Sequence, residues 1–425
     1  MKVTTALCVA GLLTTLVQGA PVHVKETASA TPSVHGKFLH ITDIHLDTHY
    51  LAGSDPNELC HRKTKSSKNT AGKFGTLSSQ CDSPVSLVEA SFGFMKSNIA
   101  DVDFILYTGD TARHDRDNKL ARTSKDVVQD HKQVIQYFQN TYDLTKVKLI
   151  PTIGNNDMFD HDILTENDSM YGTLEEIWAP LGLNLTNDWR KGGYFVQNIN
   201  DKLRVINTNS MFFFNKNDNV DDCVSGSPGQ IQMQWIQQQL TAARNAKAQV
   251  YIIGHVPPND DDGSLLFKNK CHSQYLNLLG QFGDVVSGHF TGHTNDDVLT
   301  AIVPNGKSVI AMPDESPKSL SQVSTVLFNA PSIVPANNPA IRVYNYETSA
   351  NAKGSAYGSI LDWTQYYADL EKANAAGKLN YELEYVASQL FSVKNFNDVG
   401  VKQAFSNLNT NSTARQLYSK VVKVS

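Results

Sequence analysis

The sequence has little cysteine, no excess of positive charge and no long apolar run beyond its N-terminus. None of its 5 cysteines belongs to a C-x2-C pair, which argues against a zinc site built from thiolates. Lys and Arg total 37 against 42 Asp and Glu, giving a net charge of -5, so no nucleic acid partner is expected. Internal repeats and long low-complexity tracts are also missing. What remains, 40% hydrophobic and 19% charged residues, is typical of an ordinary folded protein.

The one apolar run lies at the N-terminus. Lys2 precedes the apolar residues 6–17, and small residues follow at positions 19 and 20. This is the layout of a cleaved secretory signal peptide, and it is short for a membrane span. We therefore expect residues 1–20 to be removed, with a retained signal anchor as the alternative, and no membrane span in the mature chain. The destination would be the secretory pathway, either the vacuole lumen or the cell exterior.

Cleavage would remove Cys8 and leave an even number of cysteines, which in an exported chain indicates disulfides. Of the three possible pairings, we favour the one between chain neighbours: Cys60 with Cys81 and Cys223 with Cys271. Acceptor sequons for N-glycosylation fit the same route and occur at Asn167, Asn184 and Asn411.

Beyond an aperiodic leader over residues 21–36, short apolar strands alternate with polar loops and helices. This alternation predicts a layered α/β fold. Strands are expected at 38–41, 104–107, 148–151, 203–207, 250–253 and 285–286, then at 299–303, 308–312 and 324–328. Helices are expected from Ser83 to Asn98 and from Pro228 onward.

The later strands follow one another without helices, which indicates a second sheet. The segment SMFFFNK, residues 210–216, is expected to be a strand and its turn rather than an aromatic platform for a substrate. From about residue 352 the pattern becomes helical. We therefore divide the chain into a main domain, residues 37–350, and a small C-terminal helical region, residues 351–425.

Polar side chains follow several of these strands, in each case near a glycine. Because the carboxyl ends of strands in an α/β sheet face the crevice where ligands bind, we expect these side chains to converge. Asp43 and His45 also lie two residues apart, which puts both on one face of an extended chain. In chain order the candidates are Asp43, His45, Asp110, Asn155, His255, His293 and Asn295.

Each motif alone has a plain structural interpretation. Asn155, Asn156 and Asp157 in LIPTIGNNDMFD suit a turn, since Asn and Asp bond their own backbone and tolerate left-handed conformations. Repetition at successive strand ends is what favours a ligand site. Imidazole and carboxylate groups suit Zn, Mn, Fe or Co ions. Two such ions about 3.5–4 Å apart clamp a phosphoryl substitution and activate a bridging water.

In this scheme Asp110 would be the bridge, because a carboxylate between two cations is stabilised by both. His114, four residues beyond it, would donate a proton to the leaving oxygen, a role that suits histidine near neutral pH.

Taken in order, the motifs D-x-H, GD-x3-H, GN, GH and GH-x-[HN] over residues 38–296 resemble the calcineurin-like metallophosphoesterases. The resemblance implies two β-sheets packed as a sandwich and flanked by helices, with residues 37–350 as the catalytic domain. It implies one metal held by Asp43, His45, Asp110 and Asn295. It implies a second metal held by Asp110, Asn155, His255 and His293.

The family usually has histidine where this chain has Asn156 and Asn295. The GNND and GHxN forms, with TGDTARHDRDNKLART, SQCDSPVSLVEASF and PSIVPANNPAIRVYNY, are similar to fungal endopolyphosphatases. Those relatives of acid sphingomyelinase cleave inorganic polyphosphate internally. We therefore group Asn156 with His114 as candidate catalytic residues. The fungal vacuolar enzymes are often longer and membrane-anchored, so vacuole and exterior both stay open.

Two basic stretches lie near these motifs. Lys63 and Lys65 belong to CHRKTKSSKNTAGK, while Arg113 and Arg116 follow Asp110. On an acidic chain they are candidates for guiding a polyanionic substrate, and the alternative is ordinary solvated loop charge. In the second stretch, Asp115 and neighbouring acids dilute the positive field.

The function expected from these observations is hydrolysis of phosphoanhydride bonds inside inorganic polyphosphate by a metal-bridging hydroxide. One alternative is a sphingomyelinase-type phosphodiesterase acting on a phospholipid or nucleotide, although residues 21–36 supply no apolar segment for docking to a membrane. Another is a secreted binding protein that lost turnover through Asn156 and Asn295.

Overall fold

The computed structural model of the chain describes residues 36–425 except 66, 313–319, 350–353 and 425. The expected signal peptide and nearly all of the expected leader lie outside the described residues. Among the residues that are described, no helix is both long enough and apolar enough to cross a membrane.

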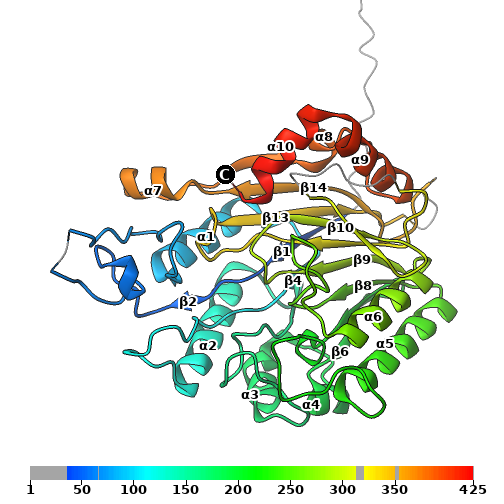
Figure 1. The fold of residues 1–425 in the computed structure, drawn as a ribbon, viewed down its shortest axis with the longest axis horizontal. Helices are drawn as coiled ribbons and strands as arrows, with labels where there is room; N and C mark the ends of the chain where they lie inside the picture. Colours follow the sequence, from blue (N-terminus) through cyan, green and yellow to red (C-terminus); the bar gives the residue numbers. More distant parts are fainter. Residues whose placement is uncertain (1–35, 66, 313–319, 350–353, 425) are drawn as a thin grey trace, which may run out of the picture. The chain divides into compact units, whose positions relative to one another are not determined.

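Two β-sheets form the centre of the fold (Figure 1). The strands of the first sheet are β1 (Lys37–Ile41), β4 (Phe104–Tyr107), β5 (Lys148–Pro151), β13 (Ala340–Tyr346), β14 (Ile360–Tyr367) and β15 (Glu382–Val386). Their order across the sheet is β15-β14-β13-β1-β4-β5. Strands β1, β4 and β5 run parallel, so their carboxyl ends share one edge.

The second sheet contains β6 (Phe195–Asn200), β7 (Leu203–Asn207), β8 (Gln249–Ile253), β9 (Val286–Thr291), β10 (Val298–Ile302), β11 (Ser308–Ile310) and β12 (Thr325–Asn329). Their order is β11-β10-β12-β9-β8-β7-β6, with β7, β8 and β9 parallel. A separate small ladder pairs β2 (Leu46–Asp47) with β3 (Ser83–Pro84). Strand β9 is longer than the expected 285–286 and carries the chain directly to His293.

Aromatic side chains fill the space between the two sheets. On β1, Phe38 stacks on Tyr344 of its own sheet, with ring centroids 4.9 Å apart. It also contacts Tyr251 of β8 and Phe290 of β9 in the other sheet, at 5.4 and 5.3 Å between centroids. All of these rings are fully buried. The sheets therefore pack face to face as a sandwich with an aromatic core.

Helices cover both sheets. Helices α1 (Val85–Asn98) and α2 (Ser124–Thr141) lie on the first sheet, where Phe138 of α2 packs against Tyr107 of β4. Helix α2 starts at a capping box, in which the Thr123 and Asp126 side chains each accept the backbone N–H of the other residue. Helices α5 (Pro228–Asn245) and α6 (Asn269–Gln281) lie on the second sheet. Shorter helices, α3 (Ser169–Trp178) and α4 (Asn187–Gly192), precede β6.

The helical expectation for residues 360–367 is wrong, because this segment is strand β14 and pairs antiparallel with β13. Its side chains Trp363 and Gln365 are buried two residues apart, a strand period that the surrounding helix-forming residues obscure in the sequence. The helical expectation is also wrong for residues 382–386, which form strand β15 and extend the same edge. Helices follow or intervene as α7 (Leu370–Ala376), α8 (Ala387–Leu390), α9 (Asp398–Thr410) and α10 (Ser412–Val422). The domain division at residue 350 stays a prediction.

Two disulfides tie loops to this framework. Cys60 is bonded to Cys81, and Cys223 is bonded to Cys271, so each bond joins chain neighbours. The first closes the loop between β2 and β3. The second fastens the segment before α5 to α6.

Candidate metal centre

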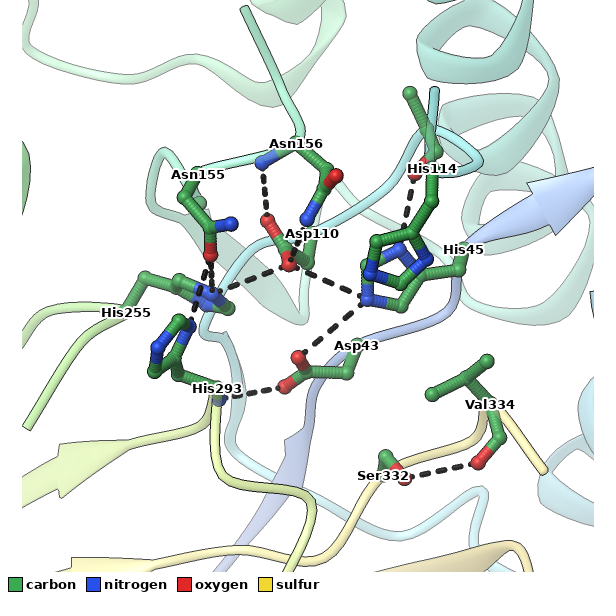
Figure 2. Close-up of polar contacts among 12 residues, drawn as sticks. Asp43, His45, Asp110, His114, Asn155, Asn156, His255, His293, Ser332 and Val334 are labelled. Carbon is green, nitrogen blue, oxygen red and sulfur yellow. Dashed lines mark hydrogen bonds and ion pairs between the residues drawn. The ribbon is translucent and has the colours of Figure 1, made fainter. Parts of the chain in front are cut away.

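The polar side chains predicted to converge lie in loops that leave the carboxyl ends of β1, β4, β5, β8 and β9. Figure 2 shows the side chains from these loops turned toward one another around Asp110. Parallel strands of both sheets thus bring their ends to one place, which explains how residues 43 to 293 meet.

Asp110 lies at the centre of the arrangement. Its Oδ2 is 3.2 Å from Nε2 of His45 and 3.3 Å from Nε2 of His255. The two imidazoles come from different sheets, and all three side chains are buried. A carboxylate oxygen shared by two ligand-type nitrogens is the geometry expected of a residue that bridges two cations.

On one side of Asp110, Asp43 and His45 form the first group of donor atoms. Asp43 Oδ1 is 3.6 Å from His45 Nε2, and it is a buried oxygen without a hydrogen-bond partner among the described residues. Donor atoms of Asp43, Asp110 and His255 also lie within 4.8 Å of one another. A buried, unpaired carboxylate oxygen is unfavourable unless a cation accompanies it.

On the other side, Asn155, His255 and His293 form the second group. Asn155 Oδ1 is 3.0 Å from His255 Nε2 and 2.8 Å from His293 Nδ1. The Asn155 amide nitrogen faces away, where it donates to Asp162 Oδ1 at 3.0 Å and contacts His161 Nε2 at 3.1 Å. Sequence reasoning missed these two supporting residues.

Backbone carbonyls orient the imidazoles. His45 Nδ1 donates to the Ala112 carbonyl at 3.0 Å, and His255 Nδ1 donates to the Thr108 carbonyl at 2.7 Å. In each ring the Nε2 atom is therefore the one left for a metal.

The donor residues hold strained backbone conformations. Left-handed φ angles occur at Asp43 (50°), His45 (42°), Asp110 (58°), His293 (73°) and Asn295 (63°). Such conformations are unfavourable for residues with a Cβ atom and cluster at functional sites. Glycine is needed beside them, because a Cβ at Gly154 would collide with the Asp110 carboxylate.

Asp157 supports the backbone of the loops that carry Asp110 and Gly154. Its carboxylate accepts the backbone N–H groups of Asp110, Thr111 and Gly154 at 2.9, 2.7 and 2.7 Å. Asp157 thus holds the backbone of the Asp110 loop.

The electrostatics of the two groups favour bound positive charge. Burial would lower the pKa of His255, but the Asp110 and Asp43 carboxylates raise it to about 9. Burial would raise the pKa of Asp110, but His255 and His45 hold it well below its usual range. The carboxylates thus favour positive charge on His45 and His255, whereas burial lowers the pKa of His293 to about 3. Metal binding would release the protons of the first two rings. Carboxylate, imidazole and amide donors together suit divalent transition-metal ions.

Asn295 is less directly placed. Its Nδ2 lies 3.4 Å from the His293 carbonyl, and its Oδ1 is buried without a hydrogen-bond partner among the described residues. Among those residues it makes no hydrogen bond to the first group, where the resemblance would put it.

The two candidate catalytic residues occupy different positions. Asn156 donates its backbone N–H and its side-chain Nδ2 to the Asp110 carboxylate. His114 stacks on the His45 ring, with centroids 4.1 Å apart. Its Nδ1 lies 2.6 Å from Oδ1 of Asp82, a residue of the SQCDSPVSLVEASF segment to which the sequence assigned no role.

The basic candidates differ in exposure. Arg113 is 1% exposed, and its guanidinium donates to the carbonyls of His114 and Leu120, so its assignment as a substrate contact is corrected. Arg116, Lys63 and Lys65 are exposed.

Sequence reasoning also missed an exposed cation, Lys216, on the side of the centre that carries His293. Lys216 Nζ lies 5.8 Å from the Phe214 ring centroid, and that ring meets His293 edge-on at 5.2 Å. Phe214 follows a short 3-10 turn, Ser210–Phe212, rather than the expected strand.

Comparison with known proteins places this geometry in a family. The calcineurin-like phosphoesterase model matches residues 36–296, and the model of the acid sphingomyelin phosphodiesterase C-terminal region matches residues 319–422. An endopolyphosphatase of Cryptococcus neoformans is 34% identical over 299 residues, covering 62% of this chain and 43% of that protein. The chain thus spans less than half the length of this relative.

Other relatives match more of the chain at lower identity. Sphingomyelinase phosphodiesterase C of Dictyostelium discoideum is 27% identical, over 88% of this chain and 82% of its own length. The cyclic GMP-AMP phosphodiesterase SMPDL3A of Mus musculus is 28% identical, over 86% and 79%. Since the first family model covers more than half of the sequence and ends just beyond His293 and Asn295, the chain belongs to the calcineurin-like phosphoesterases.

Proposed function

We propose that the protein is a two-metal hydrolase that cuts phosphoanhydride bonds inside inorganic polyphosphate. The observation that carries the proposal is the position of Asp110 Oδ2, shared between His45 on one side and His255 on the other. A purely structural role does not explain this arrangement, because burying several ionisable groups together is unfavourable for the stability of the fold.

When bound, two divalent ions supply a hydroxide nucleophile and neutralise charge on the phosphoryl group. The residues of the chain then have separate tasks. Asn155, His255 and His293 hold the second position, while Asp43 and His45 hold the first. Asn156 fixes the carboxylate between them through its two hydrogen bonds. His114 gives the leaving oxygen a proton from Nε2, since its Nδ1 faces Asp82.

Exposed cations on both sides of the centre support a polyanionic substrate. Arg116 lies two residues from His114. Burial would raise the pKa of Asp82, but His114 and, to a smaller extent, Arg116 hold it below its usual range. Lys216 is on the side of His293. A chain of phosphates that continues in both directions from the scissile bond would meet positive charge at each end. Lys63 and Lys65 would extend this field.

A phosphodiesterase is the second candidate function. It is supported by the sphingomyelinase-type relatives, which match the catalytic and the C-terminal regions together. The same metal centre would serve, and the leaving group would be an alcohol, which depends more on a proton from His114.

A digest of long polyphosphate with added divalent metal, followed on a gel, tests the proposal. Internal cutting gives intermediate lengths early in the reaction, and the Asp110→Ala variant should give none. Cleavage of a phosphodiester without cleavage of polyphosphate would favour the second candidate. No turnover with metal content near zero would favour a binding protein.

The proposed route for the chain is the secretory pathway, ending in the vacuole lumen or outside the cell. Both disulfides support it, as do the exposed sequon residues Asn167, Asn184 and Asn411. A mobility shift after endoglycosidase treatment of the protein from its native host would test glycosylation.

A further inference from the structure

We propose that Asp82 is the positioning residue that orients His114 as proton donor, and that the Cys60–Cys81 disulfide keeps Asp82 in place. This inference rests on the proposed hydrolase function. It assigns Asp82 a role in positioning the proton donor and gives one of the two disulfides a role in turnover.

Asp82 binds His114 at two points. Its Oδ1 lies 2.6 Å from the ring atom Nδ1, and its Oδ2 accepts the His114 backbone N–H at 2.8 Å. One carboxylate thus fixes both the main chain and the ring of His114. Asp82 is only 6% exposed, so water competes little for these bonds.

The orientation of the His114 ring is also restricted by its stacking on a neighbouring imidazole. One face stacks on His45, which belongs to the first donor group, with 4.1 Å between centroids and 13° between planes. Nε2 makes no hydrogen bond within the described part of the chain, so it is the ring atom available to a leaving oxygen. Asp82 and His45 together leave the ring one orientation beside the metal centre.

The position of Asp82 is set from both sides along the chain. Before it, Cys81 is buried and bonded to Cys60. After it, Ser83 pairs with Leu46 in the β2–β3 ladder and donates its backbone N–H to the His45 carbonyl at 3.0 Å. The segment that carries Asp82 is therefore joined covalently to one loop and by hydrogen bonds to the strand beside a donor residue.

Polar contacts also hold the loop that the disulfide closes. His61 contacts Asp47 and Asp117 at 2.9 and 2.6 Å, and Arg62 pairs with Asp117 at 2.8 Å. Loss of the disulfide should therefore loosen Asp82 without unfolding the protein. A chain with Cys60 and Cys81 reduced would bind metal and substrate but donate protons poorly.

The test compares two substrates that differ in their need for a proton. Bis(4-nitrophenyl) phosphate releases a leaving group that departs without protonation, whereas diphenyl phosphate releases a more basic phenolate. Asp82→Ala should lower kcat for diphenyl phosphate about 100-fold and for the nitrophenyl ester less than about 5-fold. Asp82→Asn, which keeps the shape of the side chain, should show a smaller effect with the same preference. Metal content should equal that of the wild type.

The disulfide is tested in the same way. Cys60→Ser with Cys81→Ser should show the same selective loss on diphenyl phosphate, about 10-fold or more. Cys223→Ser with Cys271→Ser is the matched control, because neither cysteine forms a hydrogen bond to the donor groups within the described residues, and it should keep the wild-type ratio. Equal slowing of both esters in Asp82→Ala would overturn the role of Asp82. An unchanged ratio in the Cys60/Cys81 variant would overturn the role of the disulfide. Polyphosphate cutting by the wild type tests the proposed function separately.

Discussion

Asn156 donates two hydrogen bonds to Asp110, from its backbone N–H to Oδ1 and from its side-chain Nδ2 to Oδ2, both at 2.8 Å. The family usually has histidine at this position. The structure shows a direct support of the shared carboxylate. The Asn156 Oδ1 atom is buried and has no hydrogen-bond partner among the described residues.

Replacing Asn156 by alanine should weaken metal binding. The Asp110 carboxylate would keep the backbone donor and lose the side-chain donor, and groups that support metal ligands in this way typically contribute 10–100-fold in affinity or activity. Metal content after dialysis at limiting metal, measured together with polyphosphate turnover, would show the loss. Asn156→His, which restores a ring N–H, should retain more metal than Asn156→Ala. Wild-type metal content in the alanine variant would contradict this role.

Removal of divalent metal should lower the melting temperature of the protein. Ions that bind the folded chain and not the unfolded chain stabilise it, by about 2.7 kcal/mol when the free ion is at 100 times its Kd. Asp43 and Asp110 are buried carboxylates whose ion-pair partners in the ion-free protein are imidazoles. Thermal unfolding after chelation and after metal addition measures the effect. Asp110→Asn keeps the volume of the side chain and should abolish most of the metal-dependent rise.

Much of the fold could be predicted from local sequence. Strands at 104–107, 148–151 and 203–207 have the expected bounds, because each is a short apolar run that ends at polar or glycine-containing loops. Placing Asp, His and Asn after such strands was sufficient to predict that Asp110 and His255 meet.

What could not be predicted depends on contacts between distant parts of the chain. Strand β14 is recognisable only through its burial against Arg342 and Phe328, which no local pattern encodes. Asp82 belongs to the quoted segment SQCDSPVSLVEASF, but it reaches His114 through a loop closed by a disulfide, a contact that the local sequence does not encode. Arg113 was assigned to substrate by its charge, whereas burial directs its donors to backbone carbonyls.

Lys216→Glu should weaken the binding of polyphosphate. Reversing a charge on the His293 side of the centre removes attraction for the chain and adds repulsion, so KM should rise roughly 10-fold at low salt. The change should shrink at high ionic strength, where exposed charges are screened. Steady-state kinetics at two salt concentrations would measure it. Lys307→Glu is the control. Lys307 is exposed in the turn between β10 and β11, at the edge of the sheet away from the strand ends that carry the donor residues. An equal KM for both variants would contradict the proposed substrate path.

The buried pair of Arg342 and Asp297 should be important for stability. Arg342 Nη2 lies 2.6 Å from Asp297 Oδ1, both side chains are almost fully buried, and Asp297 donates its backbone N–H to Val422 of α10. Asp297→Ala leaves an uncompensated buried guanidinium and should cost about 3–5 kcal/mol in the free energy of unfolding. Denaturant unfolding measures this. Arg342→Met combined with Asp297→Leu removes both charges and should recover most of the loss. A double variant less stable than Asp297→Ala would show that the packing around the pair matters more than its charge.

His61 should make stability depend on pH. Its Nε2 lies 2.9 Å from Asp47 Oδ2 and its Nδ1 lies 2.6 Å from Asp117 Oδ2, and both nitrogens donate only when the ring is protonated. Burial would lower the pKa of His61, but the two carboxylates raise it. A raised folded-state pKa gives stabilisation that is complete below the ordinary value of about 6.5 and is lost as pH rises through the folded value. The melting temperature of the wild type should therefore exceed that of His61→Gln most at pH 5 and least at pH 9.

His272 provides a control with the opposite sign for this prediction. Burial lowers its pKa, and its Nε2 contacts Asn259 Oδ1 at 2.9 Å rather than a carboxylate. A lowered pKa means that the unfolded chain binds the proton more tightly, so the stabilisation by His272 falls as the solution becomes acidic. The difference between the wild type and His272→Gln should consequently widen from pH 5 to pH 9. Curves of the same slope for His61→Gln and His272→Gln would show that the carboxylates Asp47 and Asp117 do not hold a protonated ring.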